Sequence, residues 1–257
     1  MSFTTSGNGQ LCNQIIRNLA LSLIAEKNNL YVTYSNFDKI NNKLGIILFV
    51  GKNKYHNTEI IGGGDYMEYF QSKSAIKCNL NFMHGYFQNK QITNILYNHL
   101  RLNKKHIMDK NPYKFRYKNN NDVFLHIRLT DAVDFNPGMN YYDKCINIIV
   151  NEYDNIYIGS DDFNHILIKK LKKKYPKIIF IEKDPINTIQ FGSTCKYVIL
   201  SHGSFSAVIG YLAFFSKIYY PDYKPKWCPL GMYLDKGFIG VTPSPEETVT
   251  PTPTPSL

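Results

Sequence analysis

Cysteines are few and scattered in this chain, which excludes the classes of protein that depend on them. There are five, an odd number, with no CxxC pair and no Cys/His cluster at zinc-binding spacing. Neither a disulfide framework nor a structural zinc site is therefore expected. We expect each cysteine to be a small buried side chain in a reducing compartment. The five are Cys12, Cys78, Cys145, Cys195 and Cys228.

Long apolar stretches are also missing. No stretch reaches the roughly 18 to 20 apolar residues that a transmembrane helix needs, and the longest candidate, residues 207–215, is far shorter. The N-terminus, MSFTTSGNGQ, lacks the basic and then apolar segments of a secretory signal peptide. We therefore expect no integral membrane span and a cytoplasmic location.

Acidic side chains are in the minority. Twenty Asp and Glu stand against thirty Lys and Arg, which leaves a formal net charge of +10 among 257 residues. This balance favours anionic partners such as nucleotides, phosphates, nucleic acid or a membrane surface, but it does not specify a fold. The 44% of hydrophobic residues can form a large core, and the length allows one large domain or two small ones.

The sequence changes character near its end. Residues 242–257 read TPSPEETVTPTPTPSL and hold five of the twelve prolines. Alternating Thr and Pro form neither a helix nor a central strand, so we expect an extended linker or tail there. A linker of this composition predicts further domains beyond it, and a natural terminal tail is the alternative.

Before the tail, short apolar runs rich in β-branched and aromatic residues alternate with amphipathic stretches. This alternation predicts an α/β fold with parallel sheets and helices on both faces. The expected strands are residues 45–50, 123–127, 155–158, 178–181, 197–200 and 218–220. The expected helices are residues 13–26, 141–153, 163–175, 187–195 and 204–215.

The alternation is regular only after residue 122, which indicates two lobes. Residues 104–121 are polar, basic and rich in Asn, as suits a connection between lobes. We therefore divide the chain into an N-terminal lobe, residues 1–118, a C-terminal lobe, residues 119–241, and the tail, residues 242–257. Ligands of such folds bind beyond the carboxyl ends of the strands, so the loops after strands are the candidate sites.

The first candidate site is a glycine-containing loop that leads into an apolar helix. Residues 7–14 read GNGQLCNQ, and Gly9 and Asn13 are the residues that we single out. Unpaired backbone amides and a positive partial charge at a helix start suit a phosphate or a sugar hydroxyl. A flexible start followed by a capped helix also explains the pattern, since the full GxGxxG motif is absent.

A second loop of this kind follows an expected strand and begins the helix at residue 204. Residues 201–206 read SHGSFS and include Ser204, Phe205 and Ser206. Serine hydroxyls and free amides at a helix start form a cradle for phosphate. Capping of the helix explains one of the serines but not all three.

The third candidate is the end of an expected buried strand, FLHIRLTD. With a period of two, His126 and Arg128 point to one face, and Arg128 stands where the strand opens into a loop. The fixed fork of donors on an arginine suits a pyrophosphate and stabilises the charge of a nucleotide leaving group. The alternative is an internal ion pair between Arg128 and Asp131 beside a core His126.

The fourth candidate lies between another expected strand and the next helix, where the sequence reads GSDD. Ser160 and Asp161 are the residues of interest. An Asp in this position most commonly caps the helix. A carboxylate there can also accept hydrogen bonds from the N1–H and N2 amine of a guanine.

Two further patterns favour ordinary structure. Residues 61–65, IGGGD, predict a turn, and the alternative is that they line a substrate cleft. Five lysines within residues 169–174 crowd an expected helix and predict a solvated face. No RNA- or DNA-binding motif accompanies them, so nucleic-acid binding is not expected.

Taken together and in this order, the motifs resemble those of glycosyltransferase family 11, the α-1,2-fucosyltransferases, within the wider group of α-1,2-, α-1,6- and protein-O-fucosyltransferases. The family's G-x-L-G-N-Q loop is similar to residues 9–14, its G-Y-F/W-Q-S segment to residues 85–89, its H-x-R-x-x-D motif to residues 126–131 and its Tyr-Tyr pair to residues 141–142. Its S-D-D segment resembles residues 160–162, and its S-x-S-x-F-S block resembles residues 201–206. The resemblance spans about residues 7–227.

The resemblance implies a GT-B-like architecture, with two Rossmann-type lobes and a donor cleft between them. It implies an inverting glycosyltransferase that moves L-fucose from GDP-fucose to a hydroxyl of a glycan acceptor, with an α-1,2-type linkage. No metal or other cofactor is required in this interpretation. The expected partners are the nucleotide sugar and the acceptor, bound on the C-terminal and N-terminal lobes respectively.

The resemblance also assigns roles to single residues. Arg128 would bind the β-phosphate, with support from His126 and from Ser204, Phe205 and Ser206. Asp161, with Ser160, is the candidate for reading guanine, while Gly9 and Asn13 would approach the donor from the first lobe. Asp131 is either the general base or the residue that orients Arg128.

Departures from the family pattern keep other donors and one other class open. Cys12 replaces the second glycine, Leu129 and Thr130 replace an Arg-Gly pair, and residues 207–208 replace two tryptophans. They allow another nucleotide sugar, such as a xylosyl or rhamnosyl donor. Charge alone favours a second alternative, a non-catalytic protein that binds nucleic acid or glycan. The expected lack of a membrane anchor fits a bacterial or viral enzyme better than a Golgi enzyme.

Overall fold

The structure is a computed structural model, and it describes residues 1–4, 9–82, 85–149, 153–223, 230–234 and 236–243. The chain forms two compact units. The first unit is Met1–Pro112 with Gly231–Leu234, and the second is Tyr113–Leu230 with Asp235–Leu257. The boundary thus falls inside the polar connection, six residues before the lobe boundary predicted after residue 118. A short later segment, Gly231–Leu234, belongs to the first unit.

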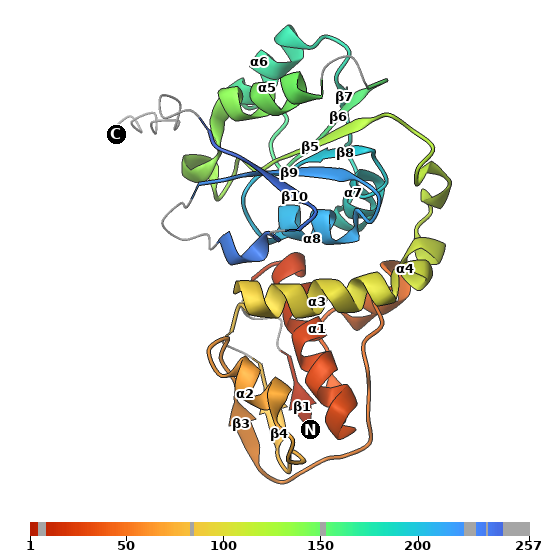
Figure 1. Ribbon diagram of the computed structural model, residues 1–257, viewed down its shortest axis with the longest axis vertical. Helices are drawn as coiled ribbons and strands as arrows, with labels where there is room; N and C mark the ends of the chain where they lie inside the picture. Colours follow the sequence, from red (N-terminus) through yellow and green to blue (C-terminus); the bar gives the residue numbers. More distant parts are fainter. Residues whose placement is uncertain (5–8, 83–84, 150–152, 224–229, 235, 244–257) are drawn as a thin grey trace. The chain divides into compact units, whose positions relative to one another are not determined.

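The second unit is built on a six-stranded parallel sheet with the order β10-β9-β8-β5-β6-β7 (Figure 1). The strands are β5 (Val123–Ile127), β6 (Ile156–Ser160), β7 (Ile179–Phe180), β8 (Tyr197–Ile199), β9 (Lys217–Pro221) and β10 (Phe238–Val241). Strand order runs outward from β5 in both directions, so it reverses beside β5 and β8. Crevices at such a reversal are where ligands of open α/β sheets bind.

Helices cover both faces of this sheet (Figure 1). Helices α5 (Gly138–Ile148) and α6 (Ile166–Lys174) lie on one face, and α7 (Pro185–Gly192) and α8 (Ser204–Leu212) lie on the other. Two short 3₁₀ turns, Lys114–Arg116 and Val133–Phe135, complete the unit up to β9. Every residue of β5 is buried, as its uninterrupted apolar run predicts for a strand covered on both faces. The predicted α/β fold with parallel sheets is confirmed.

Phe124 shows how closely α7 approaches the sheet. A Cβ added at Gly192 of α7 would lie 2.6 Å from Phe124 Cε1, and one added at Gly159 of β6 would lie 2.8 Å from Phe124 Cζ. Both distances are too short for a real Cβ, so the two glycines make room for the ring. The ring also meets Phe191 edge-on, with centroids 6.3 Å apart.

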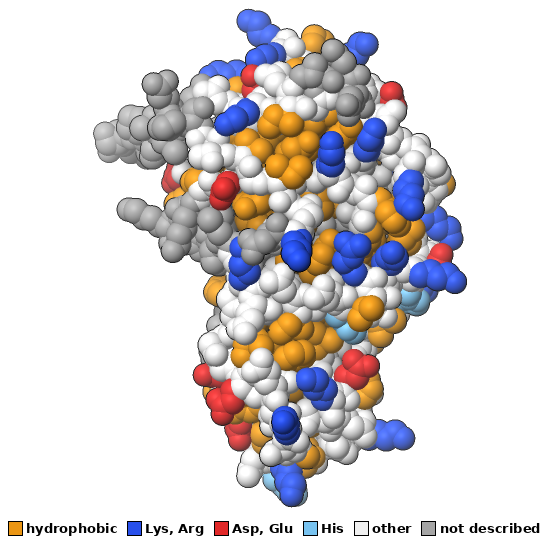
Figure 2. Space-filling model, in the orientation of Figure 1, with side chains coloured by type: hydrophobic (Ala, Val, Ile, Leu, Met, Phe, Trp, Pro, Cys, Tyr) orange, Lys and Arg blue, Asp and Glu red, His pale blue; other side chains and the backbone are white. Residues whose placement is uncertain are grey.

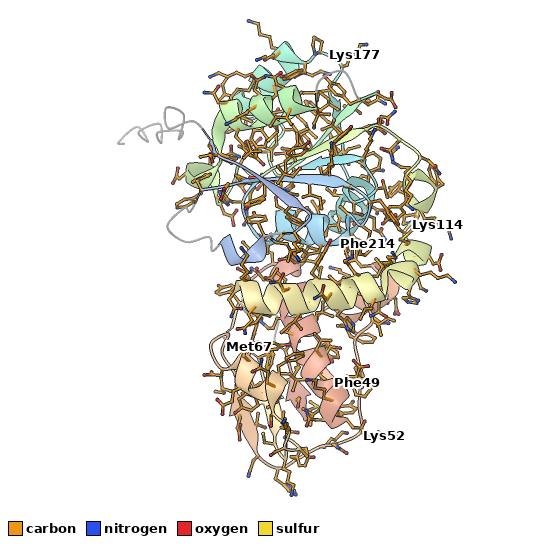
Figure 3. The ribbon with its side chains drawn as sticks, viewed as in Figure 1. Phe49, Lys52, Met67, Lys114, Lys177 and Phe214 are labelled. Atoms are coloured by element: carbon orange, nitrogen blue, oxygen red, sulfur yellow. The ribbon has the colours of Figure 1, made fainter. Side chains whose placement is uncertain are left out.

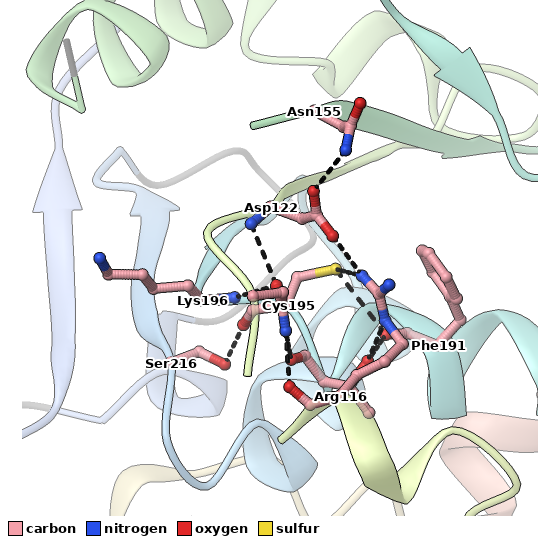
Figure 4. A network of polar contacts seen from close by, with 9 residues as sticks. Arg116, Asp122, Asn155, Phe191, Cys195, Lys196 and Ser216 are labelled. Atoms are coloured by element: carbon pink, nitrogen blue, oxygen red, sulfur yellow. Dashed lines mark hydrogen bonds and ion pairs between the residues drawn. The ribbon is translucent and has the colours of Figure 1, made fainter. Parts of the chain in front are cut away.

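A polar network closes the amino-terminal edge of the same sheet (Figure 4). The Arg116 guanidinium donates to Asp122 Oδ2 at 2.6 Å and to Thr194 Oγ1 at 3.2 Å, and it lies 4.5 Å from the centre of the Phe191 ring. Asn155 Nδ2 donates to the other oxygen of Asp122 at 2.9 Å. Because Asp122 is only 4% exposed, its charge depends on these partners.

The first unit has a smaller, four-stranded parallel sheet with the order β2-β1-β4-β3 (Figure 1). Its strands are β1 (Ser2–Phe3), β2 (Val32–Thr33), β3 (Thr58–Ile60) and β4 (Asn79–Asn81). Its helices are α1 (Leu11–Asn28), α2 (Tyr66–Gln71), α3 (Lys90–Leu102) and α4 (Lys104–Lys110), with a π-helical turn at Asp38–Lys43. A 3₁₀ turn, Leu230–Met232, begins at a residue of the second unit and continues into the first. The long helix α1 contacts both α2 and α3.

Residues 45–50 are not a strand, and this prediction is wrong. The segment keeps the alternation of a strand, with Ile46 and Leu48 buried and Ile47 exposed, but side chains and a turn take the place of a neighbouring strand. Ser22 Oγ accepts from the amide of Phe49 at 2.8 Å, and the Tyr34 hydroxyl donates to the Phe49 carbonyl at 2.5 Å. Phe49 lies in this segment, and Lys52 follows its end (Figure 3).

The structure also adds elements and moves boundaries. Helix α3 was not predicted. The sheet of the first unit and β10 were not predicted either, because strands of two to four residues carry too short a pattern to recognise. Part of the expected polar connection is helical, as α4. The helix expected at 187–195 is α7, which begins earlier because Asp184 caps it and Pro185 occupies its first position.

Several sequence-based expectations concern burial and surface. Cys12, Cys78, Cys145 and Cys195 are buried thiols, as expected, while Cys228 and residues 244–257 of the tail lie outside the described residues. Among the helices of the described ranges, none is long and apolar enough to cross a membrane. Lys and Arg side chains are spread over the face in Figure 2, in keeping with the excess of basic residues.

Candidate functional site

The predicted residues of the second unit gather at the carboxyl ends of its central strands. His126 lies near the end of β5 and Arg128 directly follows that strand, while Ser160 ends β6 and Asp161 follows it. The loop after β8 leads into α8, which begins at Ser204. Because neighbouring parallel strands end at one edge of the sheet, three separate motifs form one cluster.

Arg128 is held by a two-point ion pair. Its Nε donates to Asp131 Oδ1 at 2.8 Å and its Nη2 donates to Asp131 Oδ2 at 2.5 Å. The Arg128 guanidinium holds the pKa of the Asp131 carboxyl below its ordinary value. The structure thus contains the ion pair that was one alternative for this motif. A guanidinium held by two hydrogen bonds has a fixed orientation. Its Nε–Nη2 edge is already occupied by Asp131.

The loop before α8 is shaped to accept this arginine. Gly203 has a φ of +103°, and a Cβ added there would lie 2.7 Å from Arg128 Nη1. An L-residue would be strained by the backbone angle and would also collide with the guanidinium. Gly203 therefore lets Arg128 lie against the start of α8. The guanidinium and the backbone amides of the helix N-terminus are then next to each other.

His126 is a buried neutral base that joins β5 to α8. Its Nδ1 shares a hydrogen bond of 2.6 Å with Ser206 Oγ, and its ring lies 4.9 Å from that of Phe205. Ser206 Oγ also accepts from the Ser201 amide at 3.0 Å, so one hydroxyl fixes the loop and the histidine. Burial lowers the pKa of His126 to about 4, with Asp161 opposing and Arg128 adding to the shift.

Asp161 holds the loop that carries Arg128. Its Oδ1 accepts from the Leu129 amide at 2.7 Å, and its Oδ2 accepts from the hydroxyl of Thr130 at 2.6 Å and from the Thr130 amide at 3.3 Å. Leu129 and Thr130, two of the positions where this sequence departs from the family pattern, are thus partners of Asp161. Ser160 makes a local turn, in which its Oγ accepts from the Asp162 amide at 3.2 Å.

Asn136 is a site residue that the sequence reasoning missed. Its side chain is 1% exposed and donates to the Arg128 carbonyl at 3.0 Å and to the Tyr142 hydroxyl at 3.2 Å. Its Oδ1 accepts from the Gly138 amide at 3.0 Å. The signal was present as Asn-Pro-Gly, since Asn side chains commonly accept from the backbone two residues ahead in turns.

The adjacent tyrosines connect α5 to two of these loops. The Tyr142 hydroxyl accepts a hydrogen bond from the Asn136 side-chain amide. The Tyr141 hydroxyl donates to the Leu200 carbonyl at 2.8 Å, just after the end of β8. Both side chains are fully buried. Helix α5 therefore fixes the loops after β5 and β8 from one side, which gives the Tyr-Tyr pair a positioning role in the fold.

The predicted residues of the first unit form their own cluster. Gly9 has a φ of +87°, and a Cβ there would lie 2.4 Å from Asn13 Nδ2. Gln14 Nε2 donates to the Gly9 carbonyl at 3.0 Å, and Gln88 Nε2 donates to Asn13 Oδ1 at 2.8 Å. The structure thus joins the start of α1 to the G-Y-F-Q segment. Residues 7 and 8 of this loop lie outside the described residues.

Acid should destabilise the folded protein in a defined pH window. Burial lowers the pKa values of His126 and His202 from 6.5 to about 4, so between these values the unfolded chain binds more protons than the folded one. Stability is then full above about pH 6.5 and falls as the pH drops toward 4, by up to about 1.4 kcal/mol per pH unit for each group. Urea unfolding measured across this range checks the slope.

A substitution separates the contribution of His126 from the rest. His126→Asn should flatten the decline, because the asparagine has no proton to gain in this window, while His56→Asn at an exposed position should leave the slope as in the wild type. An unchanged slope in His126→Asn would show that His126 does not remain neutral in the fold.

The comparisons with known proteins point to one family. The model of glycosyl transferase family 11 matches residues 3–224, most of the chain. No curated protein matches at a significant level. Every motif of the clusters above lies within the matched range.

Solved structures give only distant likenesses. The α-1,6-fucosyltransferase NodZ, co-crystallised with GDP, is 12% identical with a TM-score of 0.37, over 60% of this chain and 57% of that one. NodZ from Bradyrhizobium is 11% identical with a TM-score of 0.38, over 60% of this chain and 58% of that one. The Escherichia coli heptosyltransferase WaaC with ADP is 9% identical with a TM-score of 0.49, over 94% and 93%.

The chain therefore spans less than two thirds of the NodZ chains that it matches. The assignment depends on the family model, whose match covers well over half of the residues. The order of the motifs along the chain agrees with it. This chain belongs to glycosyltransferase family 11.

Proposed function

We propose that this protein is an inverting fucosyltransferase that moves L-fucose from GDP-fucose to a hydroxyl of a glycan, with an α-1,2-type linkage. The observation that carries the proposal is the placement of Arg128. It lies at the carboxyl end of the central strand, oriented by Asp131 and set against Gly203 at the start of α8. A guanidinium and helix amides at one place suit a diphosphate.

In this mechanism the charge that develops on GDP is met by Arg128 and by α8. As the bond between the fucose anomeric carbon and the β-phosphate oxygen breaks, the bonding electrons remain with the phosphate. Arg128 and the amides at Ser204, Phe205 and Ser206 stabilise that charge more in the transition state than in the bound donor, which lowers the barrier. The acceptor hydroxyl attacks the anomeric carbon from the opposite face, and its proton passes to solvent water.

Asp131 acts in this proposal as a positioning residue. A general base works best when its pKa lies near the working pH, whereas Arg128 holds the pKa of Asp131 below its ordinary value. Two hydrogen bonds to the guanidinium also occupy both of its oxygens. We therefore assign Asp131 to orienting Arg128. Neutral His126 supports the same site by fixing Ser206.

A ligand screen tests the donor. Purified protein is mixed with GDP-fucose, GDP-mannose, UDP- and dTDP-sugars, GDP and UDP, first without metal and then with Mg²⁺ or Mn²⁺. A ligand at about 100 times its dissociation constant stabilises a protein by about 2.7 kcal/mol, which a thermal shift detects. We expect stabilisation by GDP and GDP-fucose, slow hydrolysis of GDP-fucose alone, and no need for metal.

Other outcomes of the screen are equally informative. A response confined to UDP or dTDP ligands would keep the phosphate role of Arg128 and overturn the fucose assignment. A response that appears only with metal would overturn metal independence. If no nucleotide sugar stabilises the protein or is hydrolysed, a non-catalytic binding protein is favoured. Steeply salt-dependent binding of nucleic acid is then the further check.

Asp161→Asn distinguishes the two roles open to this residue. If Asp161 holds the loop of Arg128, the variant should bind GDP and inorganic pyrophosphate more weakly by a similar factor, on the order of ten, because the phosphate site itself is disturbed. If Asp161 instead recognises guanine, the variant should bind GDP more weakly and bind pyrophosphate as the wild type does. Calorimetry with both ligands decides. Asp162→Asn, which alters the neighbouring carboxylate outside this loop contact, is the matched control.

A further inference from the structure

We propose that Tyr86 is a stacking platform for a sugar ring of the acceptor, on the first unit. The inference deepens the proposed function, on which it rests for the identity of the ligand as an acceptor glycan. It starts from the contrast between two neighbouring residues. Tyr86 is a large side chain that is 54% exposed, while the residue after it, Phe87, is 2% exposed.

The backbone has an unusual conformation at Phe87, the residue after Tyr86. Phe87 has a φ of +51°, in the left-handed region that a bulky residue rarely adopts. The conformation is held by packing, because the Phe87 ring stacks on Phe82 with centroids 4.6 Å apart and meets Tyr66 edge-on at 5.9 Å. A strained backbone that the surrounding core enforces is typical of functional positions.

The residues on either side are fixed as well. Buried Arg17 of α1 donates from Nε to the Gly85 carbonyl at 3.2 Å. Burial lowers the pKa of Arg17. Gly85 is also constrained, since a Cβ there would lie 2.5 Å from the Phe87 ring.

Gln88 completes the arrangement and supplies polar groups. Its amide donates to Asn13 Oδ1 at 2.8 Å, so the segment is tied to the start of α1. Tyr86 is thus an exposed ring on a backbone fixed at Gly85, Phe87 and Gln88. It costs little conformational entropy to use such a ring for binding, because the chain is already ordered.

The chemistry of this place fits a carbohydrate. A tyrosine ring offers an apolar face for the C–H groups of a sugar and a hydroxyl for its rim. The amides of Asn13 and Gln88 are uncharged donors and acceptors, which match sugar hydroxyls. The cation that suits a diphosphate, Arg128, belongs to the second unit. A neutral glycan, rather than the nucleotide, is therefore the ligand we assign to Tyr86.

Ligand-observed NMR tests the proposal without the donor. The probes are methyl α- and β-glycosides of galactose, glucose, mannose and N-acetylglucosamine, mixed singly with the protein in saturation-transfer experiments. We expect at least one to bind the wild type, to bind Tyr86→Ala about tenfold more weakly, and to bind Tyr86→Trp with near wild-type affinity. Leu102→Ala, at a side chain 85% exposed on α3 of the same unit, is the control and should bind as the wild type does.

Two outcomes would overturn the proposal. One is that no glycoside binds the wild type, and the other is that Tyr86→Ala binds as tightly as Leu102→Ala. Circular dichroism and thermal midpoints of each variant show whether weaker binding reflects unfolding, and retention in Tyr86→Trp excludes that explanation independently. Where an acceptor is turned over, Tyr86→Ala should raise its KM more than it lowers kcat.

This test can fail separately from the proposed function. Glycoside binding needs no nucleotide sugar, whereas the donor assignment depends on hydrolysis of GDP-fucose by the wild type. A protein that binds a glycoside through Tyr86 but ignores GDP-fucose keeps the stacking site and loses the fucosyl donor. The reverse result keeps the donor and removes the site.

Discussion

Replacing Arg128 with alanine should lower fucosyl transfer by about a hundred- to a thousandfold. That is the usual effect of removing one preorganised donor to charge that develops in a transition state. The variant also leaves Asp131 without its partner, so a negative charge near the phosphate adds to the loss. Initial rates with GDP-fucose, measured as release of GDP, give the effect on kcat, and calorimetry gives the affinity for GDP.

Two further arginine variants sharpen this prediction. Arg128→Lys keeps the positive charge and loses the fork, so it should recover only part of the activity. Arg101→Ala removes an exposed arginine that contacts Tyr97 on α3, and it should behave as the wild type. The mechanism is wrong if Arg128→Ala transfers fucose and binds GDP at near wild-type levels.

Replacing Arg116 with methionine should destabilise the protein by about 3 kcal/mol or more. The change removes the partner of a buried carboxylate, and an unpaired buried charge typically costs about 3 to 5 kcal/mol. Among the described residues, the Asp122 carboxylate would keep its hydrogen bond from Asn155, and Thr194 Oγ1 would lose the donor that reaches it from Arg116 (Figure 4). Urea and thermal unfolding of the variant, read by circular dichroism, measure the loss.

A second substitution tests the reason for that loss. Adding Asp122→Asn to Arg116→Met removes the unpaired charge, so the double variant should be more stable than Arg116→Met alone. A double variant that is less stable by the sum of the two single effects would show that the network contributes through packing and hydrogen bonds and not through the buried charge.

Most of the second unit, though not β10, could be predicted from sequence because its elements lie in clear apolar or amphipathic runs. The apolar run at residues 123–127 indicates a strand covered on both faces, and β5 is fully buried. Residues 204–215 predict a helix after a serine-containing loop, and α8 begins at Ser204. In contrast, β1 and β2 have two residues each, which is too short for periodicity to distinguish a strand from an irregular segment.

Residues 45–50 show why a pattern alone can mislead. Alternating burial follows from any extended segment that lies against a core, whereas a strand also needs a neighbour for its amides and carbonyls. Here Ser22 and Tyr34 supply those hydrogen bonds to Phe49. The predicted strand is wrong because side chains, and not a neighbouring strand, bond to this segment. Those partners could not be known without the tertiary structure.

The residue types at the candidate site were determined by the sequence, since Arg128, His126, Asp161 and the serines stand in recognisable motifs at strand ends. Which of them touch was decided only by the tertiary structure. Asp161 binds the loop that follows β5, Gly203 makes room for Arg128, and Asn136 holds the Arg128 carbonyl. The physical reason is that local sequence sets periodicity and turn chemistry, while contacts between loops depend on the order of strands in the sheet, a property of distant segments packed together.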